Sequence, residues 1–195
     1  MRRVAVAAAL AVAALSGCGG SGGAADPPEG RELYGAYRAA EDRRDDAEGR
    51  LRVAFADIAA AAEQGDREGV LAAAERGRDA AADTQELLEE ELDAARRLQE
   101  IDALERDARR LESGLETTAA GLALFVQELE IAARDPFLEE EENRREVRRL
   151  ARRGGQLSAD GESDVRRADR ALAEALGIEP RPDRDLDAPT TTQSP

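Results

Sequence analysis

The chain has 195 residues, a formal net charge of −15 at pH 7, no His and one Cys, and aromatic residues make up 3% of it. The lack of His excludes the usual Ser-His-Asp and Cys-His forms of catalysis, together with His-ligated zinc. The negative charge opposes binding to nucleic acid and to anionic lipid surfaces. We therefore expect no enzyme activity, no catalytic residues, no metal, no cofactor and no nucleic-acid partner.

The beginning of the chain has the features of an export signal. Two arginines follow the initial Met, and the next 12 residues, 4–15, are all Val, Ala or Leu. Two small residues then precede Cys18. A positive start, a short apolar run and small residues at a cleavage site define a secretory signal peptide. Because a membrane-spanning helix needs about 20 apolar residues, we expect residues 1–17 to be removed as a signal peptide.

The tetrad Leu15-Ser16-Gly17-Cys18 resembles the lipobox of bacterial lipoproteins. The resemblance covers residues 1–18 and implies signal cleavage between Gly17 and Cys18. It also implies a diacylglyceryl group on the Cys18 thiol, with fatty acyl chains such as palmitate. The protein would then be exported and held to the extracytoplasmic face of the cell membrane by this lipid. Two acyl chains suffice for stable attachment, since each buried CH₂ contributes about 0.8 kcal/mol.

Composition divides the rest of the chain into three parts. Residues 18–30 are rich in Gly and predict a lipidated flexible tether. Residues 31–177 carry the repeating apolar positions of helices and form the predicted helical bundle domain. Residues 178–195 contain four Pro and a run of three Thr, which predicts a disordered tail.

Two helices are predicted to form a hairpin around Gly65. The first is expected from about Glu29 to Gln64, and the second follows Asp66, whose side chain can cap it. Gly65 suits the left-handed conformation that ends a helix. The predicted inner face of the first helix holds Leu33, Tyr37, Ala40, Arg44, Ala47, Leu51, Ala54, Ile58 and Ala61. That of the second helix holds Leu71, Ala74, Arg78, Ala81, Gln85, Leu88, Leu92 and Ala95.

The apolar spacing then changes phase, and two interpretations are open. The helix breaks near Leu98–Asp102, with Asp102 and Glu105 forming a capping box, or one helix of about 70 residues rotates its apolar face. We favour the break because it gives three helices of similar length. The new inner face holds Ile101, Leu104, Ala108, Leu111, Leu115, Thr118, Leu122, Phe125, Leu129 and Ala132.

Two further helices are predicted towards the C-terminus. An Asp-Pro pair is typical of a helix start, and Gly is typical of a helix end. The predicted elements are a cap at Asp135, a helix over 136–153 that begins at Pro136, a stop at Gly154-Gly155, a polar loop over 158–163, and a helix over Ser163–Leu176 closed by Gly177. The whole is predicted to be an all-α antiparallel bundle of four or five helices with an up-down start.

Arg44 is the sharpest candidate site residue, because it interrupts an apolar stripe. Reflecting the hairpin about Gly65 places Glu86 opposite Arg44, with Gln85 and Glu89 close by, so we predict a contact from Arg44 to Glu86 or Glu89. This arrangement has two interpretations, a site for an anionic ligand or a polar layer that fixes the register of the helices. We adopt the polar layer. The acidic runs 89–91 and 139–142 are interpreted as solvated helix faces.

The predicted helical domain resembles no characterised family. We expect a non-catalytic interaction or structural module that is tethered to the membrane of the cell envelope and has an unidentified envelope protein as partner. The alternative is a solute-binding lipoprotein with a small ligand between helices. A pocket of roughly 300 Å³ or more, lined by convergent polar groups, would favour the alternative.

Overall fold

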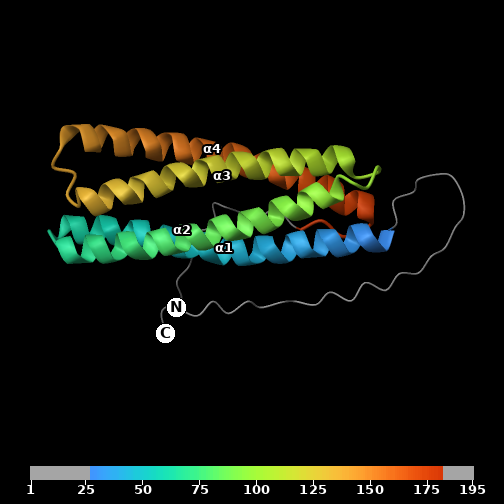
Figure 1. The fold of residues 1–195 in the computed structure, drawn as a ribbon, viewed down its shortest axis with the longest axis horizontal. Coiled ribbons are helices and arrows are strands. Elements are labelled where there is room, and N and C mark those ends of the chain that lie inside the picture. Colours follow the sequence, from blue (N-terminus) through green and yellow to red (C-terminus); the bar gives the residue numbers. More distant parts are fainter. Residues whose placement is uncertain (1–26, 182–195) are drawn as a thin grey trace, which may run out of the picture.

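The computed structural model describes residues 27–181 as four antiparallel helices, with no strand in that range (Figure 1). The predicted all-α bundle is therefore confirmed for this part of the chain. The predictions for the signal peptide, Cys18, most of the tether and residues 182–195 lie outside the described residues. The helices are α1 (Pro27–Glu63), α2 (Arg67–Leu98), α3 (Glu105–Arg134) and α4 (Glu141–Leu176).

The four helices form two hairpins that lie on each other as two layers (Figure 1). α1 packs along α2 and α3 along α4, while contacts between α2 and α3 join the layers. α1 and α4 meet where α1 begins and α4 ends, and there Arg31 Nε donates to the Leu176 carbonyl at 3.0 Å. The rings of Phe55 and Phe125 bridge the layers farther along, with centroids 5.9 Å apart. Within residues 27–181, no helix is long and apolar enough to cross a membrane.

The turn between α1 and α2 has the predicted chemistry. Gly65 has a φ of 68°, which a residue without Cβ adopts readily. Asp66 is the N-cap of α2, and its side chain accepts a hydrogen bond from the Gly69 backbone N–H at 2.9 Å. Together these two residues end one helix and begin the next within three positions.

The inner face of α2 agrees with the predicted one at only every second predicted position. At the others, the buried residue is the one immediately before the predicted residue. Leu71 is 37% exposed, and Arg78 and Gln85 are also on the surface. The corresponding buried positions hold Val70, Gly77, Thr84 and Glu91, which differ widely in size and polarity and therefore form no apolar stripe in the sequence. The buried residues of the seam are Val70, Ala74, Gly77, Ala81, Thr84, Leu88, Glu91, Ala95 and Leu98.

The helix breaks after Leu98, as favoured, but without the predicted capping box. Leu104 occupies the N-cap position of α3, and no side chain caps the helix there. Backbone hydrogen bonds bridge the connection instead, including one from the Leu104 N–H to the Ile101 carbonyl at 2.8 Å. The Leu104 side chain is buried, so apolar packing fixes this connection where a polar cap was expected.

The turn between α3 and α4 is longer than predicted. Asp135 does not start a helix at Pro136; α4 begins at Glu141. The Asp135 carboxylate accepts hydrogen bonds from the backbone N–H groups of Glu139 at 2.9 Å and Glu140 at 3.2 Å. It also accepts one from the Asn143 side chain at 2.9 Å. Asp135 therefore organises the turn and the approach to α4.

α4 is one continuous helix, so the predicted stop at Gly154-Gly155 and the predicted loop over 158–163 are both wrong. Gly154 and Gly161 lie against α3, where there is little room for a side chain. A Cβ on Gly161 would lie 2.7 Å from the Gly114 carbonyl oxygen and 2.4 Å from the Thr118 Oγ1. These glycines let two helix backbones approach closely, and packing outweighs the cost of Gly in a helix. Gly177 ends α4 with a φ of 64°, as predicted.

The described bundle extends slightly beyond the predicted boundaries at 31 and 177. α1 already begins at Pro27, which suits the first turn of a helix because its missing N–H has no partner there. At the other end, Ile178 packs against the core. Arg181 forms ion pairs with Glu41 and Asp42 of α1, at 3.1 and 2.8 Å. The residues that flank the predicted domain thus help to close the end where α1 meets α4.

Candidate functional site

Arg44 is buried at the seam between α1 and α2, where it contacts two carboxylates. Its Nε donates to Glu91 Oε1 at 2.6 Å, and its Nη1 pairs with Glu48 one turn along α1. The Arg44 side chain is 6% exposed and that of Glu91 is 0% exposed. A buried guanidinium therefore joins two helices through a carboxylate that has no contact with solvent.

The partner of Arg44 is Glu91, and the predicted contact with Glu86 or Glu89 is wrong. Glu86 and Glu89 are exposed, and Glu89 accepts a hydrogen bond from Gln85 on the surface at 3.3 Å. The interpretation of 89–91 as a solvated run therefore fails at Glu91, which occupies the inner face of α2.

The offset of the partners has a geometric cause. The exposed pairs Arg50–Asp83 and Asp57–Arg76, at 2.6 and 2.7 Å, show the same kind of offset. In each pair, the residue on α2 lies three positions farther along the chain than reflection about Gly65 predicts. Helical side chains lean towards the N-terminus of their own helix. In α1 this direction leads away from the turn, and in α2 it leads towards the turn. The partner on α2 must therefore begin farther along the chain.

Burial makes the Arg44 layer electrostatically costly. Loss of water raises the pKa of Glu91 to about 7, although the attraction of Arg44 opposes this shift. Desolvation also lowers the pKa of Arg44, but Glu91 and Glu48 outweigh it and hold the guanidinium charged. Two buried oxygens, Tyr37 Oη and Glu91 Oε2, have no hydrogen-bond partner among the described residues. The layer is thus only partly satisfied, which adds to its cost, because an unpaired polar group is unfavourable in a low-dielectric interior.

A second polar cluster joins α1 to α4, nearer to the start of α1 than Arg44 is. Tyr34 donates to Asp169 Oδ1 at 2.7 Å, and Arg38 contacts the same oxygen at 2.8 Å. Burial raises the pKa of Asp169, while the hydrogen bond from Tyr34 and the charge of Arg38 oppose the change. Arg38 also donates to Tyr34 Oη at 2.8 Å, so the three side chains bind one another and join α1 to α4.

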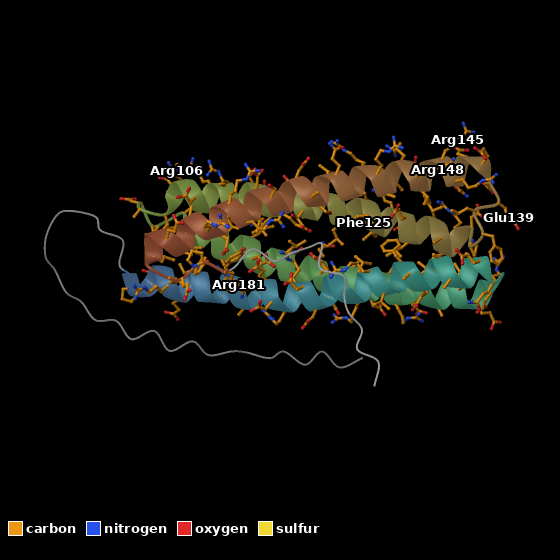
Figure 2. The ribbon with its side chains drawn as sticks, turned by 180° about the vertical axis from the view of Figure 1, so that it is seen from behind. Arg106, Phe125, Glu139, Arg145, Arg148 and Arg181 are labelled. Carbon is orange, nitrogen blue, oxygen red and sulfur yellow. The ribbon has the colours of Figure 1, made fainter. Side chains whose placement is uncertain are left out.

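Five arginines cover one side of α4, and we call them the α4 arginine face: Arg145, Arg148, Arg149, Arg152 and Arg153. Their spacing of three and four residues places them together on a helix of 3.6 residues per turn. With Gln156 they line an open hollow of about 380 Å³. Figure 2 shows Arg145 and Arg148 at the outer edge of the bundle, directed away from the α1–α2 hairpin. All the lining residues come from one helix, so the hollow lies on the surface.

Acidic neighbours balance only part of the α4 arginine face. Arg145 and Arg148 lie 3.6 and 4.0 Å from Glu141, and Arg149 pairs with Glu146 at 2.5 Å. Within residues 27–181, Arg152 and Arg153 have no ion-pair partner. Residues 141–156, from the start of α4, contain six Arg and three Glu, a local charge of +3 in a chain of −15.

These arginines fall at the end of the helix predicted over 136–153, and sequence reasoning did not identify them as a surface. The signal that could have identified the α4 arginine face was present, because Arg occupies positions 145, 148, 149, 152 and 153 at helical spacing. The predicted stop at Gly154 concealed that the helix continues. Arg166 and Arg167 return to the same side of α4 about 20 Å farther on.

Polar groups that already bind one another line the hollow beside the α3–α4 turn. It measures about 440 Å³ and is lined by Ile131, Arg134, Asp135, Glu140, Glu142, Asn143 and Glu146. The hydrogen bonds from Asn143, Glu139 and Glu140 lower the pKa of Asp135, and burial opposes this. Within residues 27–181, no group of three or more Asp, Glu, His or Cys side chains could hold a metal ion.

Comparison with known proteins adds no relative. No protein-family model matches the chain, no characterised protein matches its sequence, and no solved structure matches its fold.

Proposed function

We propose that this chain is a membrane-tethered lipoprotein of the cell envelope, whose helical bundle is a non-catalytic interaction or structural module. The observation that carries the proposal is the tetrad Leu15-Ser16-Gly17-Cys18 after a positive start and an apolar run of 12 residues. These residues lie outside the part that the structure describes, so the support is the sequence alone. The partner expected for the module is an envelope protein.

The interior of the bundle is consistent with a non-catalytic role. Its core is made mainly of Ala and Leu, with Tyr34 and Tyr37 as the bulky residues. The buried ionic groups of the Arg44 layer are bound to one another, and the hollows lie on the outside. A module of this kind presents long charged surfaces to a partner and offers little space for a substrate.

The alternative, a solute-binding lipoprotein, has one observation in its favour. The hollow beside the α3–α4 turn exceeds 300 Å³ and has polar walls. However, the Asp135 carboxylate within it already accepts three hydrogen bonds. A solute would have to displace contacts that hold the turn together, so we give preference to the interaction module.

The experiment that tests the proposal compares the native chain with Cys18→Ser by membrane fractionation of expressing bacteria. The native chain is expected in the membrane fraction, and it should leave that fraction on detergent extraction. The Cys18→Ser chain, which has no thiol for the lipid, is expected to lose this retention. Equal retention of both chains after a wash with about 1 M salt, which removes contacts between exposed charges, would contradict the proposed tether.

A further inference from the structure

The α4 arginine face is the most concentrated basic surface of an acidic protein. Its five arginines lie within nine residues, and Arg152 and Arg153 have no ion-pair partner in the described part of the chain. Arg has the planar donor fork that binds phosphate in two-point contacts. The face contains no large exposed apolar side chain, so its chemistry suits a phosphate-bearing surface better than an apolar groove.

The overall charge of −15 does not prevent such binding. Electrostatic interactions between exposed charges are screened over about 10 Å at 0.1 M salt. The acidic residues of α1 and α2 lie in the other layer of the bundle, and Arg145 and Arg148 lie at the outer edge of α4 (Figure 2). A surface that approaches this part of α4 therefore meets residues 141–156, which carry a local charge of +3.

The positions of the tether and of the α4 arginine face indicate which surface these arginines can reach. α1 begins at Pro27, at the end of the bundle where α4 finishes (Figure 1). Cys18 lies nine positions before Pro27, a distance of at most about 30 Å in extended chain. Arg148 lies 28 residues before the end of α4, which is about 42 Å along the helix. The lipid and the α4 arginine face would thus lie at opposite ends of the helical bundle.

We propose that the α4 arginine face binds the anionic phospholipid headgroups of the membrane that carries the lipid anchor, so that the bundle lies on its side. The inference rests on the proposed tether, which keeps the bundle near that membrane and raises the effective concentration of headgroups. Each Arg near an anionic surface contributes to attraction, and five on one face act together. Arg166 and Arg167, farther along the same side, extend the contact towards the tethered end.

Vesicle co-sedimentation of the mature chain from residue 18, carrying Cys18→Ser, tests this contact without the lipid. The bundle is expected to bind phosphatidylcholine vesicles mixed with phosphatidylglycerol, and to bind pure phosphatidylcholine much less. Replacement of Arg148, Arg149, Arg152 and Arg153 by Gln should weaken the binding by about tenfold or more. Raising the salt to about 1 M, where the screening length is near 3 Å, should release the native bundle.

A matched control removes the same number of positive charges elsewhere. Gln replaces Arg43, Arg50, Arg106 and Arg110, which are exposed on α1 and α3. This variant should bind anionic vesicles within about twofold of the native bundle, since its α4 arginine face is intact. Circular dichroism checks that both variants stay helical. If the fourfold α4 variant unfolds, Arg152→Gln with Arg153→Gln is used, since neither residue has an ion pair with any residue between 27 and 181.

Failure of this inference can be told apart from failure of the proposed tether. No binding of the native bundle to anionic vesicles at low salt, or equal losses in the α4 and control variants, would overturn the membrane contact. Binding of inorganic polyphosphate without vesicle binding would also overturn it. None of these results depends on lipid at Cys18, which membrane fractionation measures separately.

Discussion

Arg44 Nε lies 2.6 Å from Glu91 Oε1 across the buried seam of α1 and α2, and this is the most enclosed ion pair that joins two helices of the described bundle. Removing one member leaves a buried charge without its partner. Arg44→Met should therefore lower the free energy of unfolding by about 3 kcal/mol. Arg44→Met combined with Glu91→Leu should recover most of this loss, because the fully buried charge is then gone and only the partly exposed Glu48 loses a partner.

The exposed pair Arg50–Asp83 provides the control for this comparison. Both side chains are 56% exposed, so Arg50→Met should cost about 1 kcal/mol or less. Urea unfolding followed by circular dichroism measures all these variants. Equal costs for Arg44→Met and Arg50→Met would show that the buried pair does not determine how α1 and α2 fit together.

Glu128 should make the bundle less stable at pH 8 than at pH 5. Its side chain is 6% exposed, Oε1 has no hydrogen-bond partner among the described residues, and burial raises its pKa from 4.5 to about 7. The folded chain therefore holds a proton that the unfolded chain releases between these two values. The stability that protonation of Glu128 contributes is fully present below pH 4.5 and is lost as the pH rises through 7.

Glu128→Gln removes this ionisation while keeping the shape of the side chain. It should raise the free energy of unfolding at pH 8 by about 1–3 kcal/mol and change it much less at pH 5. Burial raises the pKa of Glu91 in the same direction, so some pH dependence should remain. Glu130→Gln, at an exposed position of α3, is the matched control. A gain from Glu128→Gln that is equal at both pH values would contradict the assignment.

The α3–α4 contact should distinguish two glycines that lie in the same helix. A Cβ on Gly161 would lie 2.7 Å from the Gly114 carbonyl oxygen, whereas a Cβ on Gly155 would meet no atom within 4 Å. Gly161→Ala should cost about 1–3 kcal/mol, because backbone would have to move. Gly155→Ala should stabilise by about 0.5–1 kcal/mol through helix propensity. Thermal unfolding compares the two, and a gain from both would contradict the close approach of α3 and α4.

Local spacing was enough to predict three of the helices and the first hairpin. Gly65 and Asp66 act through backbone conformation and a cap three residues away, so their effect could be deduced without tertiary structure. The phase change near Leu98 likewise indicated a real break. The capping box with Asp102 was wrong because burial of Leu104 fixes this connection, and burial depends on distant helices.

The wrong predictions concern residues whose surroundings in the folded chain override the structural preference of the residue type. Gly154 resembles a helix stop, yet α3 requires a small residue there. Glu91 resembles one more residue of a solvated acidic run, yet it occupies the inner face of α2 opposite Arg44. Because a polar residue at a seam position looks like a surface residue in one sequence, only the packed helices could show which Glu is buried.

The most direct test of the account is the intact mass of the protein extracted with detergent from bacterial membranes. We predict a mature chain that begins at Cys18 and carries diacylglyceryl on its sulfur, because Leu15-Ser16-Gly17-Cys18 matches the order of a lipobox. Cys18→Ser should lack this added mass and keep its helical bundle. An unmodified thiol on Cys18, or a mature chain that begins at another residue, would contradict the proposed membrane-tethered lipoprotein.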